Sequence, residues 1–467
     1  MRGKPRKVSN YDPEVNTSPE PLSSRQICGP IRLYLSSYIW PVRPQTLSDK
    51  ILRNVPAKFM SQRILILGGG FGGLFTALGL GGKQDATLVS DEDHFLFKPM
   101  LYEYLSGEVE AWHIAPDYQE LLDEGTSFIR GEADGINLDA REVTLVNRSE
   151  PISYDVLVIA LGAATNYAGV EGAEQFTLPF RTLNDANRLR RRMTEVLDRV
   201  PPASAPQDTR AKLTFAVVGG GASGVELATK MADLLRDAVK RRALHGEPRV
   251  LVIELADRLV PGMGQEIRGY VEDALEASRV EVHTETSVVK VTAGGIMLEH
   301  QNAHTEIETA AVVWVAGVRV NPLVDQLAVQ KDRRGLIIVD PTLQVRGHEN
   351  VFALGDIAFY QDVVPTLAGT AQLAFQQSSL LARNVKAFVE GRELKSKHFV
   401  ELGEAVSLGT ERAAVLSAGK VIGGPLARQA RFAMYTSRLP TWHHRLRVGA
   451  SWFFEGTEPR PLQPLGF

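Results

Sequence analysis

The chain has 467 residues, 44% apolar and 23% charged, which is enough length for about two to four domains. A net charge of −3 gives no reason to expect general nucleic-acid binding, and the apolar content excludes a disordered or collagen-like chain. No uncharged apolar run approaches the roughly 20 residues of a membrane-spanning helix. The single cysteine, Cys28, cannot form an internal disulfide or a redox pair, so redox chemistry would need a cofactor.

The first 59 residues differ from the rest of the chain. They carry a net charge of +6, contain eight prolines and lack helical or strand periodicity. Met60 directly precedes a strand pattern, which favours a start codon assigned too early. The alternative is an organelle-targeting peptide, against which the four acidic residues of this segment argue. We therefore leave residues 1–59 out of the predicted fold.

The first chemical motif is a glycine-rich turn after the apolar run 64–67, which is typical of a strand buried on both faces. In such a turn the first glycine permits a tight bend, the second lets the backbone approach a pyrophosphate, and the third lets helix pack on strand. The helix N-terminus would offer free N–H groups to the phosphate. The residues assigned to this dinucleotide site are Gly68, Gly70, Phe71, Gly72 and Gly73.

A second predicted strand, over residues 86–89, ends where such sites usually carry an acid that binds a ribose hydroxyl. Ser90 occupies that position, and Asp91 follows one residue later. The ribose ligand is therefore left open between these two residues.

The glycine pattern recurs 151 residues later, after a predicted strand over 213–218. The next predicted strand ends in Glu254, whose carboxylate would bind a ribose 2′-hydroxyl and repel the 2′-phosphate of NADPH. Glu254 therefore favours NADH, although Arg258 would favour NADPH. The glycines assigned to this second turn are Gly219, Gly221 and Gly224.

Two such turns predict two dinucleotides, and an apolar strand over 351–354 followed by Gly-Asp supports this. With the strand pattern over 154–161, these motifs resemble the two-dinucleotide-binding flavoproteins. The resemblance implies an α/β fold with two Rossmann-like domains, the FAD domain being interrupted by an NAD domain, and FAD and NADH or NADPH as cofactors. The further cofactor-binding residues assigned on this basis are Gly162, Gly317, Gly355 and Asp356.

Without a cysteine pair, the disulfide reductases and sulfide:quinone reductases of this superfamily are excluded. What remains resembles the type II NADH:quinone oxidoreductases, through the loop 95–108, the segment 224–228 and an AQxAxQ pattern at 371–376. In that family the first segment lines the flavin ring, the second carries an acid near the flavin–nicotinamide junction, and the third binds quinone. The residues implied are Lys98 and Pro99 as flavin contacts, Ala371 as a cofactor contact, and Glu226, Gln372 and Gln376 as catalytic residues.

Alternatives stay open for two of these assignments. Glu226 could be an ordinary acid stabilised by the helix dipole. Gln372 and Gln376 lie four residues apart on one predicted helix face, which suits amides beside a flat quinone headgroup but also fits an exposed polar face. No residue is assigned to a metal.

The implied function is an NAD(P)H:quinone oxidoreductase that passes hydride from NAD(P)H to FAD and two electrons on to a membrane quinone. The wording of residues 97–108 is most similar to the plant and cyanobacterial branch, which includes demethylphylloquinone reductases of vitamin K1 biosynthesis. Two alternatives remain: a soluble flavin reductase with a ferredoxin- or rubredoxin-type acceptor, and an NADH-responsive redox sensor.

The last part of the chain reverses the charge of the body. Residues 412–454 contain no acid, and their basic residues alternate with aromatic residues, which suits the surface of an anionic bilayer. A helical hairpin at a dimer interface is the alternative, and Pro440 predicts two short helices. The basic residues are Arg412, Lys420, Arg428, Arg431, Arg438, Arg445 and Arg447.

These motifs together predict a domain plan and a location. We expect a peripheral protein on the cytoplasmic face of a thylakoid or plasma membrane, or a plastid protein if residues 1–59 are a transit peptide, without nucleic-acid partners and with a homodimer left open. The predicted domains are 60–175 and 319–390 for FAD, 176–318 for NAD(P)H, and 391–467 for the membrane-associated region.

Overall fold

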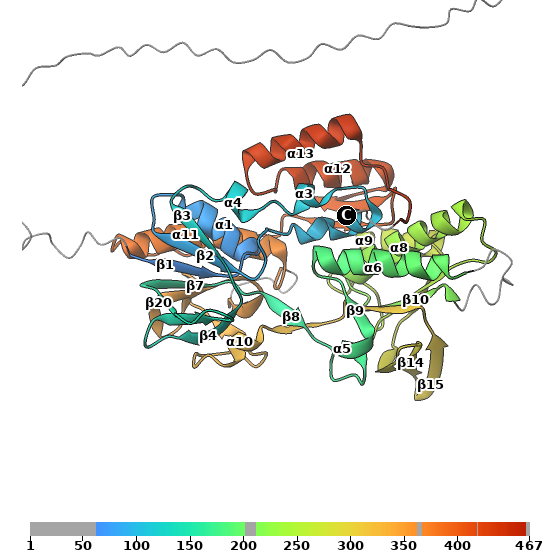
Figure 1. Cartoon of the computed structure of the whole chain (residues 1–467), viewed down its shortest axis with the longest axis horizontal. Coiled ribbons are helices and arrows are strands. Elements are labelled where there is room, and N and C mark those ends of the chain that lie inside the picture. The colour runs from blue at the N-terminus through green and yellow to red at the C-terminus, as the bar shows by residue number, and fades with distance from the viewer. Residues whose placement is uncertain (1–61, 201–211, 362–366, 418, 464–467) are drawn as a thin grey trace, which may run out of the picture. The chain divides into compact units, whose positions relative to one another are not determined.

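Two sheets organise the chain, one mostly parallel and one parallel throughout (Figure 1). The computed structural model describes residues 62–200, 212–361, 367–417 and 419–463, so the predicted leader 1–59 lies outside the described residues. Each sheet carries one of the glycine-rich turns at the end of a central strand. Across the described ranges, none of the helices has the length and apolarity needed to cross a membrane.

The first sheet has the strand order β19-β20-β7-β1-β2-β3. Its strands are β1 (Ile64–Leu67), β2 (Ala86–Ser90), β3 (Thr126–Arg130), β7 (Val156–Ile159), β19 (Gln344–Val345) and β20 (His348–Ala353). All residues of β1 and β7 are buried, as their continuous apolar runs predict. Helices α1 (Phe71–Leu80) and α11 (Ala371–Val389) pack closely together, because a Cβ at Gly79 would lie 2.6 Å from that of Ala382.

The second sheet is parallel throughout, with the order β12-β11-β10-β16-β9. Its elements are β9 (Thr177–Pro179), α6 (Leu183–Asp198), β10 (Thr214–Val218), α8 (Ala222–Arg241), β11 (Arg249–Ile253), α9 (Gln265–Ala277), β12 (Val280–His283) and β16 (Ala311–Trp314). In sequence this sheet falls between β7 and β19 of the first sheet, so one nucleotide-binding fold interrupts the other, as predicted.

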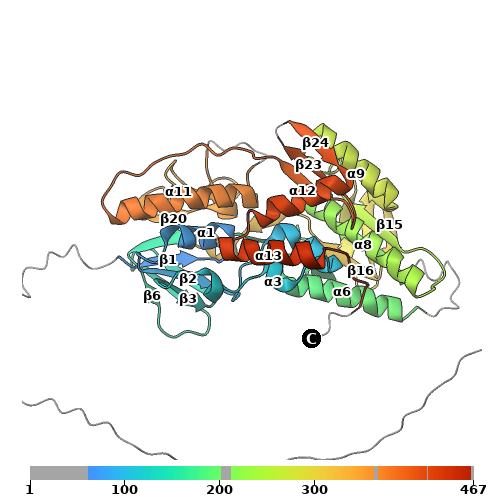
Figure 2. The same cartoon turned by 90° about the horizontal axis from the view of Figure 1, so that it is seen from above.

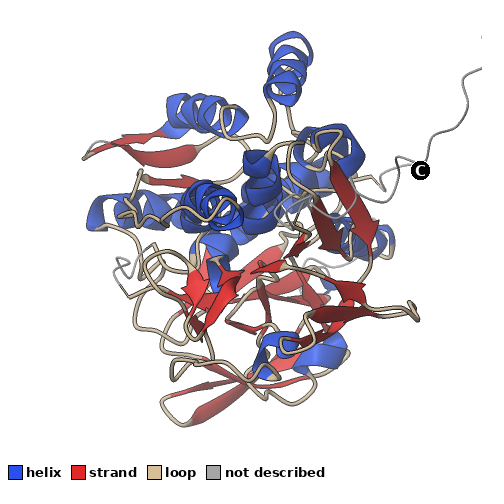
Figure 3. Cartoon of the chain, turned by 90° about the vertical axis from the view of Figure 1, so that its left-hand side faces the viewer, coloured by secondary structure: helices blue, strands red, loops and turns tan. Residues whose placement is uncertain are grey.

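Smaller elements join and flank the two sheets (Figure 3). The chain leaves the first sheet through β8 (Ala163–Thr165) and returns through β17 (Val318–Val320), and these strands pair with each other. The others are η2 (Lys98–Met100), α2 (Leu101–Ser106), α4 (Tyr118–Leu121), β4 (Ala133–Asn137), β5 (Glu142–Leu145), β6 (Ile152–Ser153), α5 (Ala173–Phe176), β13 (Ser287–Val291), β14 (Gly295–His300), β15 (Ala303–Glu308), α10 (Pro322–Asp325), β18 (Ile337–Ile338), η3 (Gly355–Ile357) and β21 (Ala358–Phe359).

The C-terminal region forms a small antiparallel sheet and two helices, with α13 packed on α3 (Figure 2). Its elements, with α3, are α3 (Ala111–Ile114), β22 (Glu404–Ser407), β23 (Ala413–Ser417), β24 (Lys420–Gly423), α12 (Gly424–Thr436) and α13 (Trp442–Glu455). The helices separate at Pro440, as predicted. His113 Nε2 lies 3.0 Å from Ser451 Oγ, which fixes α13 against α3.

The prediction that the whole basic run faces a surface is wrong for part of α12. Arg431 is 1% exposed, and Arg428 is directed to a buried carboxylate, because both satisfy acids in the interior. The side chains of Phe432, Tyr435 and Leu439 are also buried. The large apolar side chains that do lie on the outside of residues 412–454 are Ile422, Leu426, Trp442, Leu446, Phe453 and Phe454.

The end of the described chain is fastened to α6 by one buried cation. The Arg190 guanidinium donates hydrogen bonds to the carbonyl oxygens of Arg460, Pro461 and Gln463, and also to that of Leu105 in α2. We call residues 457–463 the tail segment. The Arg190 guanidinium therefore connects this segment to helices of both nucleotide-binding folds, α6 and α2.

Candidate functional site

The first glycine-rich turn has the geometry that its sequence predicts. Gly68 has φ +99°, and a Cβ there would lie 2.4 Å from the carbonyl oxygen of Ala160. A Cβ at Gly73 would lie 1.8 Å from the carbonyl oxygen of Gly68, so only glycine lets α1 approach β1. A Cβ at Gly70, in contrast, would meet nothing within 4 Å, which leaves open space beside the backbone at the helix N-terminus.

A cavity of about 370 Å³ lies above this turn. It collects predicted residues from separate parts of the chain, namely Gly68, Gly70, Ser90, Asp91, Lys98, Gly162 and Asp356. Both candidate ribose ligands, Ser90 and Asp91, line it, so that choice stays open. Pro99 is not among the lining residues, and its carbonyl oxygen instead accepts a hydrogen bond from Arg431. The lining residues that sequence analysis missed include Tyr118, Arg181 and Asn321.

A second cavity of about 250 Å³ opens toward the second sheet and shares three residues with the first: Lys98, Arg181 and Asp356. Its other walls include Tyr102, Ser223, Trp314 and the predicted Gly317. Burial and the neighbouring Arg181 guanidinium lower the pKa of Lys98, while burial raises the pKa of Asp356. The two cavities thus meet at a buried group of opposite charges.

The residues around Gly355 fit a flavin nucleotide. Gln377, which sequence analysis missed, accepts the Gly355 N–H at 2.8 Å through Oε1. Its Nε2 is buried and has no hydrogen-bond partner among the described residues. A buried donor without a partner indicates an acceptor supplied from outside the chain, and a flavin ribityl chain or ring carries several. With the open space at Gly70, this set of donors suits such a group.

The second turn repeats the first. Gly219 has φ +113°, and a Cβ at Gly224 would lie 1.7 Å from the Gly219 carbonyl oxygen, whereas Gly221 faces open space. The Glu254 carboxylate accepts the backbone N–H of Gly220 at 2.6 Å and that of Ala256 at 2.8 Å, which fixes it beside the turn.

Arg258, the residue that would favour NADPH, is already engaged. Its Nε and Nη2 lie 2.8 and 2.7 Å from the two carboxylate oxygens of Asp257. Both side chains are exposed, so this ion pair is weak and leaves the guanidinium partly neutralised rather than fixed.

The two glutamines predicted to contact quinone both hold one extended segment, residues 400–403, which we call the strap. Gln376 donates to the Val400 carbonyl oxygen at 2.7 Å and accepts the Val400 N–H at 3.1 Å. Gln372 donates to the Gly403 carbonyl oxygen and accepts the Leu402 N–H at 2.6 Å. Each amide retains one further N–H and one lone pair for a ligand. Ala371 is the first residue of α11.

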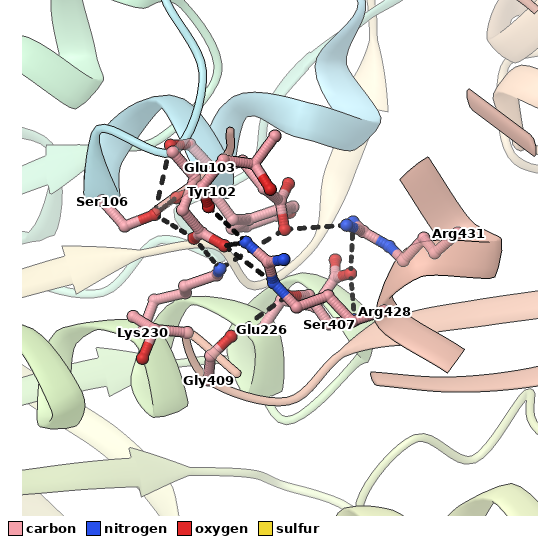
Figure 4. Close-up of polar contacts among 12 residues, drawn as sticks. Tyr102, Glu103, Ser106, Glu226, Lys230, Ser407, Gly409, Arg428 and Arg431 are labelled. Carbon is pink, nitrogen blue, oxygen red and sulfur yellow. Dashed lines mark hydrogen bonds and ion pairs between the residues drawn. The ribbon is translucent and has the colours of Figure 1, made fainter. Parts of the chain in front are cut away.

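Six charges, five of them buried, connect the α2 region, α8 and α12, and we call them the charge cluster (Figure 4). Its members are Glu103, Glu108, Glu226, Lys230, Arg428 and Arg431. Arg431 lies 2.7 Å from Glu103 and 3.2 Å from Glu226, and it also donates to the Pro99 carbonyl oxygen at 2.8 Å. The predicted Glu226 therefore belongs to a balanced interior network rather than to a simple helix N-terminus.

Burial raises the pKa of Glu226 to about 7, although Arg431 acts in the opposite direction. Its Oε1 also accepts the Ser407 N–H at 2.8 Å. Arg431 and Lys230 hold the pKa of Glu103 below its usual value even though burial alone would raise it. The two neighbouring carboxyls thus differ in how readily they take a proton.

Known proteins resemble this chain in sequence and in fold. Residues 62–378 match the family model described as pyridine nucleotide-disulphide oxidoreductase. The demethylphylloquinone reductase NdbB of Synechocystis sp. is 37% identical over 405 residues, which cover 84% of this chain and 95% of the relative. The type II NADH:quinone oxidoreductase NdhA of Mycobacterium tuberculosis is 31% identical over 409 residues, covering 84% and 86%.

The chain belongs to the pyridine nucleotide-disulphide oxidoreductase family and, within it, to the type II NADH:quinone oxidoreductases. The solved structure of NDH2 from Plasmodium falciparum in complex with NADH has the same fold, with a TM-score of 0.77 at 19% identity, over 86% of this chain and all of that one. The predicted α/β flavoprotein fold, oxidoreductase class and use of a flavin and a nicotinamide nucleotide are confirmed. Cys28 is the single cysteine of the chain and precedes the matched residues 62–378, so these residues contain no dithiol.

Apart from Glu226, the charge cluster is a further part of this oxidoreductase that the sequence did not predict. One signal was present: Arg428, Arg431 and Tyr435 lie at helical spacing on the same face of α12 as the apolar Phe432. A stripe of this kind predicts an inward face, and the arginines in it predict interior acids. Counting the basic residues of 412–454 together did not separate those on this inward face from those on the outside.

Proposed function

We propose that the protein is an FAD-dependent NAD(P)H:quinone oxidoreductase that works at a membrane surface. The observation that carries the proposal is that Lys98, Arg181 and Asp356 line both the cavity above the first glycine-rich turn and the cavity facing the second sheet. A flavin ring in the first cavity would therefore lie where a nicotinamide in the second could approach it. When bound, FAD accepts a hydride from NAD(P)H and supplies two electrons to a quinone.

The chain's own residues would hold and orient these groups. The first turn and Asp356 would bind FAD, and the second turn and Glu254 would bind the nicotinamide nucleotide. Glu226 would exchange a proton near neutral pH, in line with its raised pKa, while Arg431 keeps it beside the flavin loop at Pro99. Gln372 and Gln376 would present their spare amide groups to the quinone.

A naphthoquinone is the substrate we favour. The support is the 37% identity, over 84% of this chain, to a relative named demethylphylloquinone reductase, together with the residues 97–108 that resemble that branch. The exposed Trp442, Phe453 and Phe454 of α13 support a peripheral site on lipid, where such a quinone is dissolved.

The test uses the purified full chain with FAD bound. NADH should bleach the flavin absorbance without oxygen, and a naphthoquinone analogue should restore it faster than plastoquinone or ubiquinone analogues do. Restoration by ferredoxin or rubredoxin, but by no quinone, would instead support the soluble reductase. Slow restoration by every acceptor would support a redox sensor and contradict the proposal.

A further inference from the structure

Lys230 occupies a position in the charge cluster that its sequence spacing does not suggest. It lies four residues after Glu226 on α8, a spacing that favours a direct Glu–Lys pair. Instead its Nζ forms ion pairs with Glu108 and, at 3.5 Å, with Glu103, both from the α2 region. Lys230 is 1% exposed, so its charge must be matched inside the protein.

The ion pairs of the cluster form one alternating series. Arg428 pairs with Glu108 at 2.7 Å, Glu108 with Lys230, and Lys230 with Glu103. Glu103 then pairs with Arg431, which pairs with Glu226. Three cations thus match three carboxylates, and Glu226 is the acid at the end of the series.

Arg431 is shared between two acids. Glu103 Oε1 accepts a hydrogen bond from Arg431 and forms an ion pair with Lys230, while Glu103 Oε2 has no partner within the described part of the chain. Without Lys230, Glu103 would depend on Arg431 alone, and the buried site would hold one uncompensated negative charge. Such a site takes up a proton, and Glu226, whose pKa burial raises to about 7, is an acid of the series that can accept it.

We propose that Lys230 is a positioning residue for the reaction: by neutralising Glu103 and Glu108 it keeps Arg431 available to Glu226, and so sets the charge state of Glu226 from the far side of the cluster. This rests on the proposed function, in which Glu226 serves the nucleotide junction. The groups facing Glu226 are Tyr102 and Glu103 from the α2 side, Lys230 from α8, the Ser407 N–H, and Arg431 and Tyr435 from α12.

The test changes the charge on each side of one ion pair. Lys230→Met removes a cation, so the pH midpoint of flavin reduction by NADH should rise by about one unit or more. Glu108→Gln removes an anion from the same pair, so the midpoint should fall. The double variant restores neutrality and should return the midpoint toward that of the wild type. Stopped-flow traces of the FAD-bound proteins from pH 5 to 9 would measure all three.

A second readout does not depend on turnover. Difference infrared spectroscopy of the oxidised protein would follow the carboxylic acid band of Glu226, which Glu226→Gln assigns. In Lys230→Met this band should persist to a higher pH than in the wild type. In Glu108→Gln it should disappear at a lower pH. Unmoved midpoints would overturn the proposal and leave Lys230 a structural residue. If Lys230→Met does not fold, the downward shift in Glu108→Gln decides. If the wild-type protein reduced no quinone, the proposed quinone oxidoreductase function would be contradicted. The infrared titration would still test the role of Lys230.

Discussion

At the scale of single residues, we propose that Glu254 controls which nicotinamide nucleotide the second turn accepts. Its carboxylate is fixed by two backbone N–H groups beside the glycines, so it cannot move away from an incoming 2′-phosphate. Arg258, the residue that could attract that phosphate, is engaged by Asp257. In the proposed binding mode, this anion would lie where NADPH carries its extra phosphate.

We expect NADH to reduce the flavin with a higher kcat/KM than NADPH, and Glu254→Gln to narrow that difference about tenfold, corresponding to about 1.4 kcal/mol of relieved repulsion. The glutamine side chain keeps one oxygen that accepts a hydrogen bond from the second turn. Flavin is proposed to bind at the first turn, so flavin binding should not change. Glu247→Gln is the matched control, since it removes an exposed negative charge at the other end of β11. Preference for NADPH in the wild type would transfer the assignment to Arg258.

Among the elements, α11 and the strap form a unit whose amide pairs resemble a short β-ladder. The predicted glutamines are part of this unit, so changing them removes both the proposed quinone contact and the support of the strap. A third amide on α11, Asn384, holds Lys395 by the same pair of hydrogen bonds at 2.8 and 3.0 Å. It offers an internal comparison.

Changing Gln372 and Gln376 together to Leu should leave FAD binding and NADH-driven reduction nearly intact and slow reoxidation by quinone about ten- to a hundredfold, or about 1–3 kcal/mol. Asn384→Leu should lower the melting temperature without slowing reoxidation. Half-reactions separated by stopped flow would measure this. Equal slowing of both half-reactions would mean that α11 merely supports the flavin.

Helix α13 presents the apolar side chains proposed to enter lipid. Phe453 and Phe454 are 83% and 82% exposed, so neither contributes much to the core. Phe453→Ser with Phe454→Ser should weaken binding to anionic vesicles about a hundredfold and leave reduction of a water-soluble quinone unchanged. Phe176→Ser on α5 is the control for an exposed Phe elsewhere. Vesicle flotation would measure this, and undiminished flotation would move the contact away from α13.

At the scale of the whole chain, local pattern and long-range pairing were not equally predictable. The turns at Gly68 and Gly219 and the strands that lead into them follow from neighbouring residues, so the sequence was sufficient. The charge cluster joins Glu108 to Arg428, 320 residues apart, and no local pattern encodes such a partner. Arg428 and Arg431 were therefore assigned to the surface although they compensate buried acids.

The folded core should not require residues 1–59. The family match begins at residue 62, and the cavity above the first turn is lined from Leu67 onward. A chain beginning at Met60 should therefore bind FAD with unchanged stoichiometry and melt at an unchanged temperature. Absorbance spectra and thermal denaturation would measure this, with the full chain as reference. A truncated protein without flavin would show that the leader belongs to the fold.

The grip of Arg190 on the tail segment has a consequence for the order of synthesis. The carbonyl oxygens of Arg460, Pro461 and Gln463 leave the ribosome some 270 residues after the guanidinium that needs them. Both nucleotide-binding folds can form earlier, because domains generally fold in the order in which they are made. Until translation is nearly complete, Arg190 has Leu105 as a partner but lacks these three carbonyl oxygens, so water must occupy their places. This joint between the tail segment and α6 is therefore one of the last parts of the fold to form.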